Sequence, residues 1–117
     1  MHAEVVFNGE HFTVKALETE SGKCYFEEFY DDLEESEKKD VDQLIKFFSN
    51  RMQVKNTEKF RKLRDKVFEL KPHPARLPGF YSGKGVFIIS HGFKKGEPIE
   101  QEIKKAKRLR KRYLSRR

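Results

Sequence analysis

The run Val86–His91 (VFIISH) constrains the fold of this chain more than any other segment. It is the most hydrophobic run of β type in the sequence, and its β-branched and aromatic residues favour a strand at the centre of a sheet. The chain has 117 residues, of which 38% are charged, so few apolar residues remain for a core. We therefore expect a single domain, residues 1–117, with one modest core around this strand.

The first half of the chain predicts two short strands followed by two helices. Glu4–Phe7 and Phe12–Ala16 are β-type runs, and the Asn8-Gly9 dipeptide between them suits a tight hairpin turn. Apolar residues at helical spacing then form two stripes. The first stripe is Phe26, Phe29, Tyr30 and Leu33, and the second is Val41, Leu44, Ile45 and Phe48. A short link between them predicts a helical hairpin.

The second half predicts three strands and a last helix. Lys66–Lys71 alternates in strand fashion, with Glu69 and Lys71 on one side and Phe68 and Leu70 on the other. A strand at residues 76–81 and a turn at residues 82–85 lead into Val86–His91. Pro98 suits the first turn of a helix, whose apolar stripe is Ile99, Ile103, Ala106, Leu109 and Tyr113. The predicted fold class is α+β: a small, antiparallel, twisted sheet with an N-terminal helical hairpin and a C-terminal helix.

Several classes of protein are disfavoured by the composition. Cys24 is the only cysteine, so an internal disulfide is impossible, which fits a reducing cytoplasmic setting. The N-terminus does not resemble a signal peptide, and no stretch approaches the roughly 18 apolar residues of a membrane span, so we expect no membrane partner. The four histidines and Cys24 show no zinc-ligand spacing, and no phosphate-loop motif is present. We expect neither a metal nor a cofactor.

Charge divides the chain into two unlike parts. Residues 1–50 contain 5 Lys/Arg and 13 Asp/Glu, a net charge of −8, whereas residues 51–117 contain 21 and 6, a net charge of +15. An excess of this size predicts a polyanionic partner, and nucleic acid is the most common one. The alternative is that the two halves partly neutralise each other across the fold.

Three pieces of the basic half, in this order and at this spacing, resemble a known family. They are Phe60–Leu63 followed by Phe68-Glu69-Leu70-Lys71; Arg76 leading to Gly79-Phe80-Tyr81; and His91-Gly92-Phe93-Lys94-Lys95 ahead of a helix that begins near Pro98. The series resembles the RelE/ParE superfamily of bacterial toxins, in its HigB-like, phage-derived branch. The resemblance extends over about residues 4–113 and is specific from Lys59 onward.

The resemblance implies the toxin of a type II toxin–antitoxin system. Most members cut mRNA in the ribosomal A site, and a protein antitoxin holds them inactive. The expected activity is therefore metal-independent endonucleolytic cleavage of mRNA, with mRNA, the ribosome and a cognate antitoxin as partners. Two alternatives remain open: a ParE-like poison of DNA gyrase, and a non-catalytic nucleic-acid-binding phage protein that has kept only the fold.

The resemblance also assigns residues to the expected site. The catalytic candidates are Lys71, Arg76, His91, Lys94 and Lys95. The candidates for RNA binding are Arg61, Lys62, His73, Lys104, Lys107, Arg108 and Lys111. An arginine fork can grip two phosphate oxygens, and an imidazole can transfer protons near neutral pH. His91 could equally be a packed structural residue at the end of its strand. The loop after Lys95 is shorter than the family's, and the tyrosine that some relatives carry in the last helix is missing.

Overall fold

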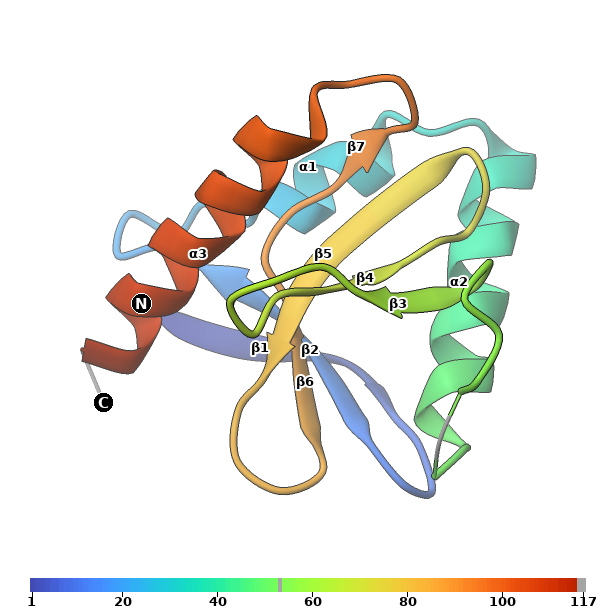
Figure 1. Ribbon diagram of the computed structural model, residues 1–117, viewed down its shortest axis with the longest axis horizontal. Coiled ribbons are helices and arrows are strands. Elements are labelled where there is room, and N and C mark those ends of the chain that lie inside the picture. Colours follow the sequence, from blue (N-terminus) through green and yellow to red (C-terminus); the bar gives the residue numbers. More distant parts are fainter. Residues whose placement is uncertain (53, 116–117) are drawn as a thin grey trace.

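A computed structural model describes residues 1–52 and 54–115 of the chain. Seven strands form one sheet, in the order β1-β2-β6-β5-β4-β3, and the short strand β7 pairs with β5 (Figure 1). The strands are β1 His2–Asn8, β2 Thr13–Glu18, β3 Phe60–Lys62, β4 Phe68–Leu70, β5 Ala75–Tyr81, β6 Val86–Ile89 and β7 Phe93–Lys94. The helices are α1 Tyr25–Asp31, α2 Glu35–Ser49 and α3 Ile99–Ser115.

The sheet is mixed, so the prediction of an antiparallel sheet is wrong. β2 and β6 run parallel, with Val14 opposite Phe87 and Ala16 opposite Ile89, while the other pairings are antiparallel. A parallel pair needs a long crossover between its strands. Here α1, α2 and β3–β5 all lie between β2 and β6 in the sequence, and this return places the hydrophobic run Val86–Ile89 at the centre of the sheet.

The fold class placed a helical hairpin at the N-terminus, which is wrong, although the predicted order of two strands before two helices is confirmed. The chain begins with a β-hairpin, β1–β2, and the helices α1 and α2 follow it. The hairpin turn lies against the end of α2: the backbone N–H groups of His11 and Phe12 both donate to the Ser49 carbonyl at 2.9 Å. A Cβ at Gly9 would lie 2.3 Å from the same carbonyl oxygen. Gly9 therefore permits a backbone approach that any other residue would obstruct.

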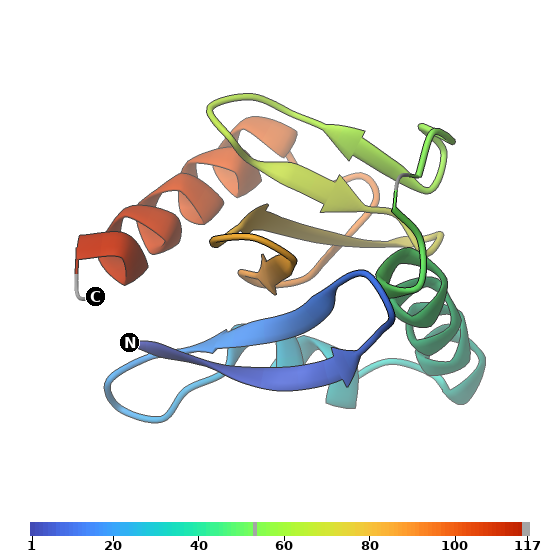
Figure 2. The same cartoon turned by 90° about the horizontal axis from the view of Figure 1, so that it is seen from below.

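Helices cover both faces of the sheet (Figures 1 and 2). On one face, Val41, Ile45 and Phe48 of α2 pack with Leu77 and Phe87 of the central strands. The Phe48 ring lies 4.9–5.2 Å, between centroids, from the rings of Phe12, Phe60 and Phe87. On the other face, Leu109 of α3 packs against Leu17, Phe80 and Ile88. The predicted apolar stripe of the last helix is confirmed, since Ile103, Ala106 and Leu109 are buried.

Two short strands were missing from the sequence-based prediction. β3 pairs with β4, with Arg61 opposite Glu69, and β7 pairs with β5, with Phe93 opposite Arg76. The alternation predicted for Lys66–Lys71 is confirmed only for the strand itself, Phe68–Leu70: Phe68 and Leu70 belong to the core on the α2 side, and Glu69 between them does not. Four of the twelve predicted site residues lie on these strands, namely Arg61 and Lys62 on β3, Arg76 on β5 and Lys94 on β7. Among the described residues, no helix is both long and apolar enough to cross a membrane.

Candidate nucleic-acid cleft

A cleft of about 750 Å³ opens between α2 and the connection from β4 to β5. Four of the predicted site residues line it, namely Lys71, His73, Arg76 and Lys95. Lys59, from the segment before β3, adds a fifth basic side chain. We call this the basic cleft. Its volume falls within the range of small-ligand sites, and its cations suit a phosphate group.

Lys71 and Arg76 face each other across the start of the turn between β4 and β5. Leu70 is paired with Leu77, so the next residue on each strand, Lys71 and Arg76, falls opposite its counterpart. The β4–β5 connection between them carries His73, which is exposed. The backbone N–H of Lys95 donates to the Pro74 carbonyl at 2.9 Å and so fixes the loop after β7 beside this turn.

A buried carboxylate lies behind Arg76. Glu69 is fully buried on β4, and its Oε1 accepts a hydrogen bond from Arg61 Nε at 3.1 Å. Arg76 Nε lies 4.0 Å from the same oxygen, and a terminal guanidinium nitrogen of Arg76 donates to the Ala75 carbonyl at 3.0 Å. The second oxygen of Glu69 is buried without a hydrogen-bond partner among the described residues. Glu69 thus attracts two guanidinium groups and orients Arg76.

The environment of Lys71 lowers the pKa of its amine. Burial lowers the pKa of Lys71 from its ordinary value of 10.5, and the nearby charges of Arg61 and Arg76 lower it further. Its Nζ donates to the Thr57 carbonyl at 3.0 Å, which holds the side chain at the cleft. A lysine with a lowered pKa can accept a proton from a substrate hydroxyl more readily than an ordinary lysine.

His91 lies outside the basic cleft. It is 1% exposed, with Nδ1 2.8 Å from Ser90 Oγ and Nε2 2.9 Å from Glu102 Oε1. Burial, with the charges of Lys105 and Arg108, lowers the pKa of His91 to about 3, so its imidazole is neutral. The His91 side chain therefore connects the end of β6 to Glu102 of α3 by a hydrogen bond, and it lies outside the cleft that Lys71 and Arg76 line.

Lys94 also points away from the cleft. Its Nζ donates to Glu37 Oε2 at 2.9 Å, at the N-terminus of α2. Hydrogen bonds from the Glu34 backbone and from Lys94 lower the pKa of Glu37, so the pair is an ion pair. Of the two adjacent lysines, the structure places only Lys95 in the cleft.

The predicted RNA-binding residues of α3 lie on the face of the sheet opposite α2. Lys104, Arg108 and Lys111 are exposed, while Lys107 Nζ lies 2.9 Å from Asp65 Oδ2 in the β3–β4 turn. Lys62 is exposed on the edge strand β3, and its neighbour Arg61 is held by Glu69. Lys104, Arg108 and Lys111 make α3 a basic surface, and none of the residues named here lines the cleft.

No site role was predicted for the residues on the helical side of the cleft. Asp40, Gln43, Leu44 and Phe47 of α2 line it, at i, i+3, i+4 and i+7, and we call them the α2 wall. Asn56 and Glu58 line the cleft beside Lys59. Helical spacing alone would group the four wall residues on one side of α2. Nothing in the sequence shows, however, that this side faces Lys71 and Arg76.

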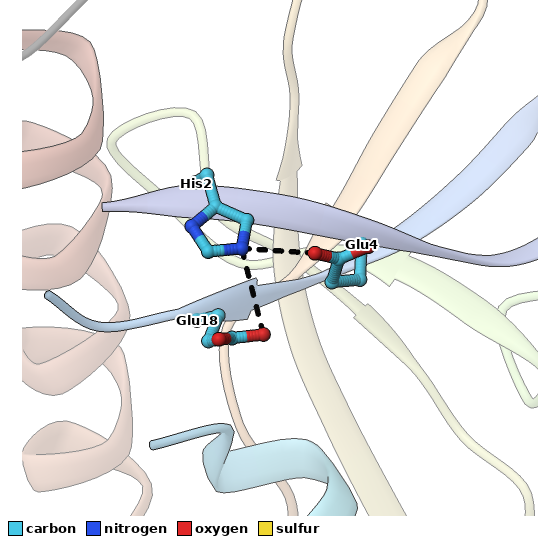
Figure 3. A group of neighbouring side chains, drawn as sticks. All are labelled: His2, Glu4 and Glu18. Carbon is cyan, nitrogen blue, oxygen red and sulfur yellow. Dashed lines mark hydrogen bonds and ion pairs between the residues drawn. The ribbon is translucent and has the colours of Figure 1, made fainter. Parts of the chain in front are cut away.

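One group of side chains lies close enough together to hold a metal ion. His2, Glu4 and Glu18 each present a ligand atom, and these atoms all lie within 4.8 Å of one another (Figure 3). His2 Nε2 lies 2.9 Å from Glu4 Oε1 and 3.5 Å from Glu18 Oε2, and the register of the hairpin places His2 opposite Glu18. One imidazole and two carboxylates are suitable Zn²⁺ ligands. The group is on the β1–β2 hairpin, and none of its members lines the basic cleft.

No protein-family model matches the chain, and no curated protein matches it. The residues of the basic cleft are therefore the basis for assigning a function.

Proposed function

We propose that the chain is a metal-independent endoribonuclease that binds the phosphate backbone of RNA in the basic cleft. The observation that carries this proposal is the convergence of Lys71, His73, Arg76 and Lys95 on one cleft from two separate segments of the chain. Following the resemblance, we further propose that it is the toxin of a toxin–antitoxin pair and that its substrate is mRNA on the ribosome.

The chemistry requires a base, an acid and a group that stabilises the phosphate. A neutral Lys71 takes the proton of the 2′-hydroxyl, whose oxygen attacks the adjacent phosphorus. Arg76 and Lys95 stabilise the charge that develops on the phosphoryl oxygens, and Glu69 keeps the Arg76 fork oriented. His73, when protonated, gives its proton to the 5′-oxygen as the phosphorus–oxygen bond breaks. The products are a 2′,3′-cyclic phosphate and a 5′-hydroxyl.

The cations outside the cleft bind RNA or the ribosome and take no part in the cleavage step. Lys62, Lys104, Arg108 and Lys111 are exposed, and the half of the chain that contains them has a net charge of +15. Contacts of this kind hold a polyanion nearby and weaken as salt is added. In this scheme the basic surface on α3 increases affinity for RNA or the ribosome, whereas the cleft determines where the backbone is cut.

A cognate antitoxin is the proposed protein partner. β1 is an edge strand of the sheet, and Val5 on it is 55% exposed. An extended segment of a partner can add to such an edge, while acidic residues of the same partner would neutralise the cleft.

A second candidate, nucleic-acid binding without cleavage, is favoured by the position of His91. Its burial removes the most obvious titratable residue of the predicted site from the cleft. This candidate includes the ParE-like alternative, in which the chain poisons gyrase and leaves RNA intact.

Induced expression in bacterial cells separates these functions. The nuclease stops translation and leaves mRNAs cut within coding frames, and Arg76→Ala abolishes both effects. Arg76→Lys keeps the charge but loses the fork, so partial activity of this variant supports a bidentate phosphate contact. Intact mRNA with accumulating gyrase–DNA breaks would instead show that the chain is a gyrase poison. Intact mRNA and normal growth, with RNA binding retained, would establish the non-catalytic protein.

A further inference from the structure

The basic cleft has two unlike sides. Its cations come from the sheet side, at Lys71, Arg76 and Lys95, whereas the α2 wall presents a carboxylate, an amide, an aliphatic side chain and an aromatic ring. A site for phosphate alone does not need the second set. A nucleotide does, because its base has an aromatic face and polar edges while its phosphate carries the charge.

We infer that the α2 wall binds the base of the nucleotide whose phosphate lies against Lys71 and Arg76, with Phe47 as the stacking residue. This inference rests on the proposed function. It makes the cleft a nucleotide site with a base end and a phosphate end, and it assigns Phe47 as a binding residue for RNA.

The surroundings of Phe47 suit this role. Its side chain is 36% exposed, which is unusual for a large aromatic residue, and it lines the cleft. The Arg51 guanidinium carbon lies 4.3 Å from the centroid of the ring. This cation–π contact limits the positions of the ring, so less freedom is lost when a base stacks on it.

The remaining wall residues provide hydrogen-bonding groups for the edge of a base. Asp40 accepts hydrogen bonds, and the Gln43 amide both donates and accepts. Both are exposed, and each lies four residues before another wall residue, Asp40 before Leu44 and Gln43 before Phe47. Such groups read bases in single-stranded RNA, where the base edges are free.

The test compares the binding of adenosine 5′-monophosphate and ribose 5-phosphate, which share the phosphate and differ in the base. Stacking on one aromatic side chain contributes about 1–3 kcal/mol, so we expect adenosine 5′-monophosphate to bind about 5- to 150-fold more tightly. Phe47→Ala should remove most of this preference while leaving the affinity for ribose 5-phosphate unchanged. Phe47→Tyr should keep the preference, and Phe47→Leu, which retains the packing but not the ring, should lose it.

The outcomes distinguish this inference from the proposed function. Equal binding of the two compounds by the wild type, or an undiminished preference in both Phe47→Ala and Phe47→Leu, would overturn the assignment of the α2 wall alone. RNA cleavage by the wild type would still support the nuclease in that case. If neither compound binds and RNA is not cut, both the proposed function and the base site are wrong. Arg76→Ala should weaken both compounds alike, because it removes the contact to the phosphate.

Discussion

Arg61 Nε donates a hydrogen bond of 3.1 Å to Oε1 of Glu69, a carboxylate with no exposed surface. The same oxygen lies 4.0 Å from Nε of Arg76, which lines the basic cleft. A buried carboxylate between two guanidinium groups is stable only while its partners remain. Glu69 therefore connects the stability of β3–β5 to the position of the proposed phosphate-binding arginine.

Glu69→Gln should lower the free energy of unfolding, because the amide cannot neutralise Arg61 and Arg76. We expect a loss of about 1–3 kcal/mol, in line with the loss of a charged hydrogen bond from a buried site. Urea denaturation at neutral pH measures it. Glu58→Gln is the matched control, since Glu58 is exposed in the same cleft. An equal effect of the two substitutions would contradict the role of Glu69.

The pH dependence of RNA cleavage should show whether Lys71 is the proton-accepting base. Burial and the neighbouring arginines lower its pKa, so its neutral, proton-accepting form becomes populated below pH 10.5. At RNA concentrations well below saturation, where the rate reports the free protein, it should rise with pH along a limb whose midpoint lies below 10.5. In Lys71→Arg the limb should disappear, because a guanidinium stays protonated. An unchanged limb in this variant would show that another group is the base.

The buried His91 should make the protein less stable in mild acid. Its pKa is about 3 in the folded chain and 6.5 as an ordinary histidine, so between these values the unfolded state binds more protons. Its contribution to stability is complete above pH 6.5 and is lost as the pH falls toward 3. The slope from this group is at most about 1.4 kcal/mol per pH unit.

Comparing His91→Gln with the wild type at pH 7 and pH 4.5 isolates this contribution. The comparison matters because Glu102, whose pKa is raised by burial, titrates with the opposite sign. The variant should lose less stability between the two pH values than the wild type. An equal loss in both would show that His91 is not held neutral.

Lys66→Gly should raise the free energy of unfolding. Asp65 and Lys66 occupy the middle of the β3–β4 turn with φ of 52° and 68°, a left-handed conformation that glycine adopts without strain. We expect a gain of about 0.5–1 kcal/mol, after the entropy that glycine loses on folding. Lys62→Gly, in the adjacent strand β3, should have the opposite effect. Thermal unfolding of the two variants checks both signs.

Local patterns in the sequence predicted those features of the fold that depend on residues close together in the chain. The hydrophobicity of Val86–Ile89 predicted the central strand, and the spacing of Ile103, Ala106 and Leu109 predicted the buried side of α3. The parallel pairing of β2 with β6 was not predictable in this way, because it depends on how a crossover of more than sixty residues returns to the sheet.

Part of the candidate site could likewise be predicted from the sequence. Lys71, His73, Arg76 and Lys95 come together because the β4–β5 turn and β7 are neighbours in the sheet. The sequence could not show that Glu102 of α3 would bond to His91, or that Glu37 would pair with Lys94 and hold it outside the cleft. Nor could it show the α2 wall, because its four residues face the cleft only once α2 has packed on the sheet. Each of these features depends on contacts between distant segments.

The products of RNA cleavage test the central claim most directly. Purified protein is mixed with a synthetic RNA, alone and on ribosomes, and the ends of the fragments are identified by mass spectrometry. The proposed chemistry predicts a 2′,3′-cyclic phosphate and a 5′-hydroxyl, and no cleavage when the nucleotide before the cut carries a 2′-deoxyribose. For RNA that is cut without ribosomes, it also predicts full activity in EDTA. It also predicts a rate for Arg76→Ala that is lower by about 10²–10³. Intact RNA under both conditions, or wild-type rates with Arg76→Ala, would contradict the account.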